Sequence, residues 1–262
     1  MRALDTAATG MAAQDLKVQV IAGNIANMGT TGFKSQRAEF QDLIYEHVQR
    51  IGAQASDNGN ILPVGIELGS GVKTVGTPRL MTQGTLQQTG NTLDVAIQGT
   101  GWFKILMPDG TFSYTLDGSF QMDSQGRIVT AEGNLVQPTI TIPPNSTGLT
   151  INQQGQVSVT LPGTTSSSIL GQFTITTFLN DAGLQANGDN LFVATPASGT
   201  PQDGVAATNG AGTLLQGSLE QSNVEAVTEI TNLIQAQRAY EMNSKVITAA
   251  DQMLQSTAQL MR

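Results

Sequence analysis

The chain ends in a segment of about forty residues, from Asn223 to Arg262, that reads NVEAVTEITNLIQAQRAYEMNSKVITAADQMLQSTAQLMR. Apolar residues recur in this segment at intervals of seven, at Leu233, Tyr240, Ile247, Leu254 and Met261. No Gly or Pro interrupts the chain after Gly217. This pattern predicts one long amphipathic helix, which would extend roughly 60 Å at 1.5 Å per residue.

The first segment of the chain repeats the pattern. Its apolar residues also stand seven apart, at Leu4, Met11, Val18 and Ile25. Because a helix of roughly 60 Å is longer than a compact domain of this size, much of its apolar stripe must be covered by another segment or another copy of the chain. We therefore expect the two terminal helices to pair, and these nine residues to form a subunit interface. The alternative is an ordinary two-helix core within one globular chain.

The segment after the first helix carries turn and loop signals. The helix is expected to end at residues 27–32, NMGTTG, because Asn and Gly tolerate the left-handed backbone found at helix ends. Residues 33–45 are expected to form a shorter helix. Its inward-facing residues would be Phe33, Phe40, Leu43 and Ile44. Residues 51–76 are rich in Gly and Asn and predict a loop or an extended arm.

The period changes to that of β-strands after Val72. Short strands are expected at residues 93–97, 102–106, 121–123, 127–129, 156–161 and 173–178. Turn sequences such as Pro108-Asp109-Gly110 and Glu132-Gly133-Asn134 separate them at hairpin spacing. The expected fold class is therefore α+β, with paired long N- and C-terminal amphipathic helices that are coiled-coil-like, an inserted and mostly antiparallel β domain, and an extended linker region.

Composition excludes several classes of function. A net charge of −8 argues against a protein that binds nucleic acid or anionic membranes, because both need clustered Lys and Arg. There is no cysteine, which excludes thiolate catalysis and Cys-based metal sites. The only histidine, His47, has no second candidate ligand nearby and is interpreted as a surface residue. We expect no catalytic residue, no cofactor and no metal.

Two other classes of function stay open from the residues alone. Acidic residues such as Asp181 and Asp189 could form the carboxylate pair of a hydrolase that cuts peptidoglycan, although solvated loop acids are the simpler interpretation. A monomeric binding module with a helical hairpin is the other alternative. No apolar run near the N-terminus is long enough for a signal peptide or a membrane span, so a protein that is not membrane-inserted and carries no cleaved signal is expected.

Short motifs stand at both ends of the chain. The N-terminal motifs are VIAGNIAN at residues 20–27 and TTGFK at residues 30–34, and the C-terminal motif is QRAYEMNSK at residues 237–245. Together they resemble the signatures of the flagellar rod and hook family of bacterial axial proteins. The residues that carry the family motif are Asn24, Asn27, Gly32, Phe33, Gln237, Arg238, Asn243 and Ser244.

The middle of the chain is similar to one branch of that family. Residues 83–91, QGTLQQTGN, and residues 114–120, YTLDGSF, resemble the distal rod protein. The insert from about Gly52 to Gly71 resembles the stretch that separates this rod protein from its hook relative. By that resemblance, a stiffening arm would include Ser56, Gly59, Pro63 and Gly65.

The resemblance implies a structural protein and not an enzyme. It implies a subunit of the flagellar distal rod that self-assembles into a rigid helical tube, transmits torque from motor to hook and encloses the export channel. A proximal rod or hook paralogue of the same family is the alternative. The implied location is the basal body, in the rod that spans the periplasm, after export without a cleaved signal peptide.

The resemblance also implies partners and a domain organisation. The implied partners are other copies of the chain in a helical polymer, the proximal rod proteins, the hook protein, the P-ring and L-ring proteins, the flagellar export apparatus and the rod cap protein. Residues 1–34 and 218–262 would form a terminal helical assembly domain. Residues 35–90 and 200–217 would form a linker and extended-arm domain, and residues 91–199 an outer β domain.

Overall fold

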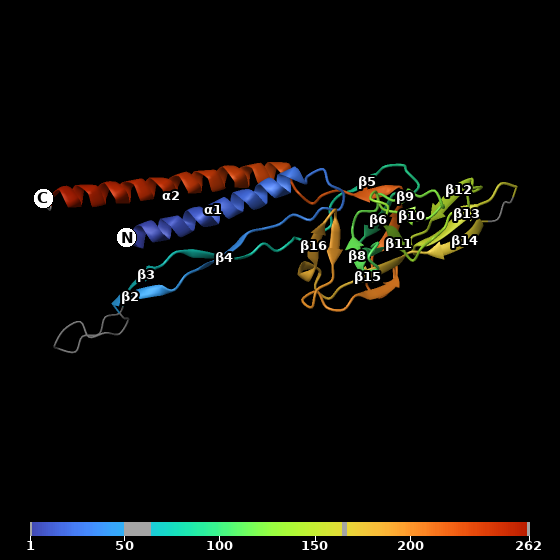
Figure 1. Ribbon diagram of the computed structural model, residues 1–262, viewed down its shortest axis with the longest axis horizontal. Coiled ribbons are helices and arrows are strands. Elements are labelled where there is room, and N and C mark those ends of the chain that lie inside the picture. The colour runs from blue at the N-terminus through green and yellow to red at the C-terminus, as the bar shows by residue number, and fades with distance from the viewer. Residues whose placement is uncertain (1, 50–63, 164–166, 261–262) are drawn as a thin grey trace. The chain divides into compact units, whose positions relative to one another are not determined.

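The computed structural model describes residues 2–49, 64–163 and 167–260. These residues form two compact units (Figure 1). Unit 1 contains Met1–Ala26, Gln36–Pro78 and Glu225–Arg262, and unit 2 contains Asn27–Ser35 and Arg79–Val224. Each unit is therefore assembled from segments that are distant in sequence. The division into three domains expected from the sequence stays a prediction.

Unit 1 is built from two helices and two short β-ladders. α1 (Arg2–Ala26) packs against α2 (Ala226–Leu260), and Figure 1 shows the two helices side by side. The end of α1 at Ala26 confirms the predicted turn at residues 27–32. The ladders are antiparallel and pair β1 (Glu39–Asp42) with β4 (Val72–Gly76), and β2 (Tyr45–Gln49) with β3 (Ile66–Gly69).

The expected fold class, with paired long helices that are coiled-coil-like, is wrong. Among the described residues α1 and α2 are the only α-helices, and most of the other elements are strands. The heptad residues form no buried seam: those of α1, Leu233 and Ile247 are half-buried, while Tyr240 and Leu254 are exposed. The residues of the two helices that are buried are Ala7, Ala13, Ile21, Asn24 and Ala236.

The physical reason lies in these buried side chains. Knobs-into-holes packing needs large apolar residues at the seam of both helices, whereas the buried residues here are mostly small or polar. α2 is also longer than α1, with 35 residues against 25, and its turns from Asp251 to Gln259 are exposed. The seven-residue spacing therefore marks a surface that α1 does not bury.

The predicted short helix at residues 33–45 is also wrong. Phe40 pairs with Thr74 of β4, and the Leu43 N–H donates to the Gly71 carbonyl at 2.8 Å. Ile44, expected to face inward, is 85% exposed. Main-chain pairing with residues some thirty positions later thus overrides the local helical pattern.

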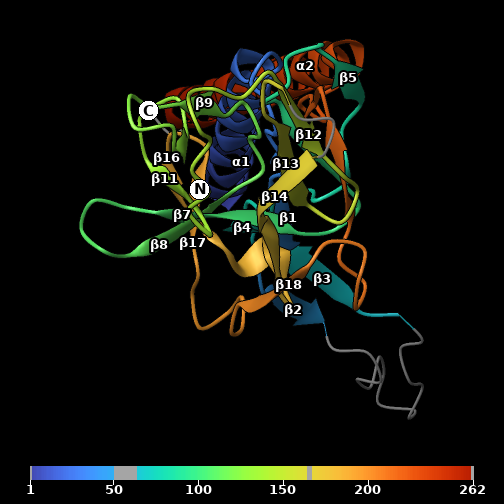
Figure 2. The same cartoon turned by 90° about the vertical axis from the view of Figure 1, so that its right-hand side faces the viewer.

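Unit 2 is an antiparallel β-structure. In the described residues its largest sheet has nine strands, with the order β16-β17-β8-β7-β11-β10-β9 and with β15 joined to β7 and β18. These strands are β7 (Trp102–Leu106), β8 (Phe112–Thr115), β9 (Gln121–Met122), β10 (Ile128–Val129), β11 (Leu135–Gln137), β15 (Thr174–Thr177), β16 (Gln185–Gly188), β17 (Leu191–Val193) and β18 (Gln202–Val205). The hairpin of β7 and β8 projects from this sheet in Figure 2.

Smaller ladders complete unit 2. A three-stranded sheet consists of β12 (Gly148–Ile151), β13 (Gln156–Thr160) and β14 (Ser167–Gln172). Two strand pairs join β6 (Val95–Gln98) to β19 (Thr213–Gln216) and β5 (Leu86–Gln88) to β20 (Ser218–Glu220). A 3-10 turn, η1 (Asp181–Gly183), precedes β16. The strands predicted from alternation are confirmed at residues 102–106, and the others agree to within about two residues at each end.

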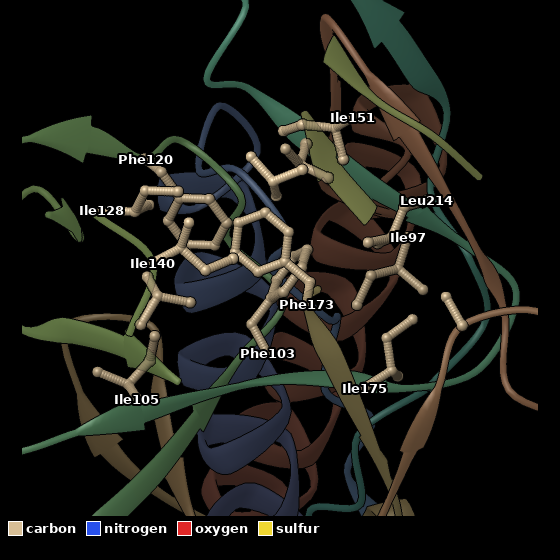
Figure 3. Close-up of a cluster of buried hydrophobic side chains, with 14 of the residues drawn as sticks. Ile97, Phe103, Ile105, Phe120, Ile128, Ile140, Ile151, Phe173, Ile175 and Leu214 are labelled. Carbon is tan, nitrogen blue, oxygen red and sulfur yellow. The ribbon is translucent and has the colours of Figure 1, made fainter. Parts of the chain in front are cut away.

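The core of unit 2 lies on both faces of β7. On one face, Phe103 packs edge to face against Phe120, with ring centroids 4.9 Å apart, and Phe173 stacks on Phe120 (Figure 3). On the other face, Trp102 packs against Phe192 at 4.9 Å in a second apolar cluster. Successive residues of a strand point to opposite faces, so one strand supplies both clusters.

Candidate subunit interface

Asn24, a residue of the family motif, ties the end of α1 to two other segments of unit 1. Its side chain is 2% exposed. Nδ2 donates to the Gln36 carbonyl at 2.9 Å and to Glu229 Oε1 at 3.1 Å, and Oδ1 accepts from the Gln36 N–H at 2.9 Å. Only an amide side chain donates and accepts in this way, so Asn24 fixes where α1 ends against the first turns of α2.

A buried ion pair holds the segment after α1 within unit 2. Lys34 Nζ lies 2.6 Å from Glu220 Oε1, and both side chains are 4% exposed. Lys34 also donates to the Thr82 carbonyl at 3.0 Å, and Glu220 Oε1 accepts from the Gly84 N–H at 2.8 Å. Because removing two charges from water is expensive, a buried pair persists only with such additional hydrogen bonds.

Gly32 occupies a position in unit 2 that requires glycine. Its φ is +67°, and its N–H donates to the Glu220 carbonyl at 2.7 Å. A Cβ at this position would lie 3.0 Å from the Leu116 carbonyl carbon. The left-handed backbone and the close approach together account for the glycine in the TTGFK motif.

Asn223 joins the segment before α2 to the segment after α1 within unit 2. Its Oδ1 accepts from the Ser35 N–H at 2.8 Å, and its Nδ2 donates to the Leu80 carbonyl at 2.8 Å. The Asn223 N–H donates to the Phe33 carbonyl at 3.3 Å. Asn27 stabilises the turn that follows α1, where Thr30 Oγ1 donates to Asn27 Oδ1 at 3.2 Å. The N-terminal motif therefore has a packing role in both units.

The C-terminal motif lies on α2. Gln237 and Arg238 are exposed, while Asn243 and Ser244 are half-buried. Asn243 lies against Gly10 of α1, where an added Cβ would be 2.9 Å from Asn243 Nδ2. Gly10 thus makes room for the polar side chain that packs on it.

The structure brings part of the predicted interface together in unit 1. Val18 and Tyr240 line an open groove of about 300 Å³ with Asp15, Gln237 and Glu241. Leu254 is exposed beyond this groove, and Met261 lies outside the described residues. Of the predicted stiffening arm, Ser56, Gly59 and Pro63 lie outside the described residues and Gly65 lies just before β3. Their assignments stay predictions.

Exposed apolar side chains extend along α2. Besides Tyr240 and Leu254, they are Val227, Ile230, Ile234, Met242, Val246 and Met253. Large apolar side chains that stay exposed on one helix are candidates for contact with another molecule. The seven-residue spacing did not single out Val227, Ile230, Ile234 and Met242, although every one of them is an apolar position on the predicted helix. No sequence signal indicated the contacts of Lys34, Glu220 or Glu229, because their partners are far away in the chain.

Residues considered for chemistry have structural contacts. His47 is exposed, with Nδ1 3.1 Å from Glu67 Oε1. Asp181 accepts a hydrogen bond from Trp102 Nε1 at 2.9 Å. Within residues 2–49, 64–163 and 167–260, no group of three or more His, Asp or Glu is placed to hold a metal ion. Across the same ranges, neither helix is long and apolar enough to cross a membrane.

Comparison with known families matches three parts of the chain. Residues 4–34 match the flagella basal body rod protein model, residues 96–159 the flagellar hook protein FlgE/F/G D1 domain, and residues 215–260 the flagellar basal body rod FlgEFG protein C-terminal model. The two terminal matches contain Asn24, Lys34, Glu220 and Asn223, the residues that form the buried junctions described above.

Individual relatives cover the whole chain. The chain is 55% identical over 260 residues to the flagellar basal-body rod protein FlgG of Caulobacter vibrioides, with 99% of each chain covered. It is 50% identical to that of Agrobacterium fabrum, with 97% of each covered, and 38% identical to that of Bacillus subtilis over the full length of both. The chain therefore belongs to the flagellar rod and hook axial family, as a structural rod protein of the basal body and not an enzyme.

Proposed function

We propose that the chain is the subunit of the distal rod, where copies assemble into a rigid helical tube that transmits torque from motor to hook and encloses the export channel. The observation that carries this proposal is the exposed apolar surface of α2. Side chains such as Val227, Met242 and Met253 are 74%, 61% and 64% exposed on a helix that has no further cover among the described residues. Burying each of them would contribute about 1.5–3 kcal/mol, which a second copy of the chain can supply.

The proposed interface combines this surface with the heptad residues. It comprises Leu4, Met11, Val18, Ile25, Leu233, Tyr240, Ile247, Leu254 and Met261. Members such as Val18 and Ile247 are half-buried in the unit where α1 packs against α2. Exposed members such as Tyr240 and Leu254 are free to contact a neighbouring copy. In the assembled polymer, the exposed apolar residues of one copy would be buried against the helices of the next copy.

The proposal includes a location and partners. The rod would span the periplasm after export of the chain through the flagellar export apparatus without a cleaved signal. Along the rod, the chain would contact the proximal rod proteins, the hook protein, the rod cap protein and the P-ring and L-ring proteins. The names of the relatives, which are rod proteins of the basal body, support this placement.

The experiment places a charge in the proposed interface. Leu254→Asp should abolish assembly, because it would bury an unpaired carboxylate between copies. The matched control is Leu179→Asp, since Leu179 of unit 2 is 94% exposed and a carboxylate there stays in water. Polymerisation is measured by sedimentation and electron microscopy, and the fluorescence of Trp102, the only tryptophan, reports the fold of unit 2. Normal polymers of Leu254→Asp would refute the interface.

The shape of the polymer separates the distal rod from its paralogues. A straight and stiff wild-type polymer is expected, whereas a curved one would favour the hook paralogue. Shortening the arm between Gly52 and Gly71 should leave assembly intact and make the polymer more flexible. Bending stiffness that does not change in the shortened variant would contradict the role proposed for the arm.

A further inference from the structure

A cavity of about 190 Å³ lies in unit 2, beside the Gly32-Phe33 turn. Its other walls are Arg79 and the hairpin of β16 and β17, which contributes residues 188–192. This volume is many times what one water molecule needs, so the cavity has room for a carboxylate side chain.

The wall of this cavity is held in place. Asp189 and Asn190 form the two-residue turn of the hairpin, with φ of 50° and 57°, as a type I′ turn requires. Asn190 Nδ2 donates to the Thr31 carbonyl at 3.3 Å, which fastens this turn to the segment that carries Gly32. The cavity is thus bounded by the Asp189-Asn190 turn and the turn that carries Gly32, which this hydrogen bond holds together.

Arg79 supplies the positive charge of the cavity. The guanidinium carbon lies 5.2 Å from the centre of the Phe192 ring, in a cation–π contact. Among the ion pairs of the described residues, none includes Arg79. Burial lowers the pKa of Arg79, as expected when no carboxylate compensates the loss of water. The guanidinium therefore keeps its five N–H donors for a ligand.

The charge balance of the chain indicates the kind of ligand. The chain has 20 Asp and Glu residues against 12 Lys and Arg residues, so neighbouring copies in a polymer repel one another unless cations of one copy meet carboxylates of the next. A planar guanidinium binds a carboxylate through two parallel hydrogen bonds. We propose that the Arg79 cavity receives an Asp or Glu side chain from a neighbouring copy of the chain.

This inference rests on the proposed polymer of identical copies and assigns to unit 2 a contact that is separate from the apolar stripe of α2. Asp189 lines the same cavity without an ion pair to Arg79. Its carboxylate would repel an incoming acidic side chain. Substitutions at positions 79 and 189 should therefore change assembly in opposite directions, which a purely structural role of Arg79 would not do.

The first test measures the critical concentration for polymerisation of the purified full chain by sedimentation. Arg79→Gln should raise it about tenfold or more, because a charge-assisted contact between copies is lost, and Asp189→Asn should lower it. The matched control is Arg127→Gln, because Arg127 is already paired with Asp123 at 2.7 Å in the same unit. This variant should leave the critical concentration nearly unchanged. Trp102 fluorescence, which is sensitive to the adjacent Phe192 ring, verifies that unit 2 stays folded.

The second test identifies the contact directly. Arg79→Lys keeps the positive charge and supplies an amine that a carbodiimide condenses with a carboxylate in contact, forming an amide with loss of water. With a mixture of isotope-labelled and unlabelled copies, mass spectrometry should find a cross-link from position 79 to an Asp or Glu of another copy, in polymer and not in monomer. Cross-links only to Asp189 of the same copy would overturn the proposal.

The remaining outcomes separate this inference from the proposed function. If Arg79→Gln polymerises like the wild-type chain while Leu254→Asp does not, the inference fails and the proposed function stands. If the wild-type chain never polymerises, both fail. Acetate, titrated at constant ionic strength, tests for a small-anion site: acetate binding at Arg79 combined with normal polymerisation of Arg79→Gln would also overturn the inference.

Discussion

Lys34 Nζ and Glu220 Oε1 lie 2.6 Å apart within unit 2, although 186 positions of sequence separate the two residues. Both side chains are almost completely buried, and their remaining hydrogen bonds go to the Thr82 carbonyl and the Gly84 N–H. The contact joins the segment that follows α1 to β20, the last strand before α2. The two segments that this ion pair joins are therefore fixed to each other within unit 2.

Removal of one partner of this pair should destabilise unit 2 strongly. Lys34→Met should lower the free energy of unfolding by about 3–5 kcal/mol, because it leaves the buried Glu220 carboxylate without a counter-charge. Denaturant unfolding followed by Trp102 fluorescence measures the change. Lys104→Met is the control: the Lys104–Asp203 pair is equally short, at 2.6 Å, but Asp203 is 42% exposed, so a smaller loss is expected. Equal losses at both sites would contradict the importance of burial.

Gly32 and Gly110 form a matched pair for testing a close approach in unit 2. Both have a positive φ, of 67° and 84°, but a Cβ at Gly32 would lie 3.0 Å from the Leu116 carbonyl carbon and a Cβ at Gly110 would meet no atom within 4 Å. Gly110→Ala should therefore lower the free energy of unfolding only by the strain of a left-handed backbone, about 1–2 kcal/mol. Gly32→Ala should lower it by clearly more. Thermal unfolding of the two variants gives the comparison. Equal shifts in Tm would mean that the contact with Leu116 relaxes freely.

Asn24 should control the order of the last turns of α1. Asn24→Ala leaves the Gln36 N–H without its acceptor, at a cost of about 1–3 kcal/mol. Gln19→Ala removes an exposed contact of the same helix, to Asp15 at 2.8 Å, and should cost only a few tenths of a kcal/mol. Amide hydrogen exchange across residues 18–26 of the full chain measures both. Unchanged exchange in Asn24→Ala would show that packing alone holds this end of α1.

Asp203 should make the stability of unit 2 fall at acidic pH. Burial raises the pKa of Asp203, but hydrogen bonds from Lys104 and Thr176 and the Lys104 charge outweigh burial and leave its pKa below the usual value. A carboxylate with a lowered folded-state pKa contributes stability above its unfolded pKa of about 3.9 and loses it as the pH falls through the folded value. Unfolding measured from pH 6 down to pH 2 should therefore show stability lost below about pH 4. Asp203→Asn should flatten this part of the profile, and a profile of the same slope in both proteins would contradict the role of Asp203.

Several features of the fold follow from local sequence. The absence of Gly and Pro after Gly217, together with a helical apolar period, leads directly to α2 at Ala226–Leu260. Alternation and hairpin turns lead to the antiparallel strands, with β7 at the predicted residues. The terminal motifs were sufficient to identify the rod and hook family. These features depend on neighbours within a few positions, which is the range that hydrophobic period and turn chemistry report.

Other features were settled by contacts between segments far apart in the chain. Spacing identified the apolar residues of α1 and α2, but it did not reveal that Ala7, Asn24 and Ala236 would be buried while the heptad residues stay half-buried or exposed. Residues 39–42 form a strand because β4 is available to pair with them. Lys34 meets Glu220, and Arg79 remains unpaired beside its cavity, through chain folding over more than a hundred positions. Such pairings depend on which surfaces meet after loop closure, and a local period carries no information about that choice.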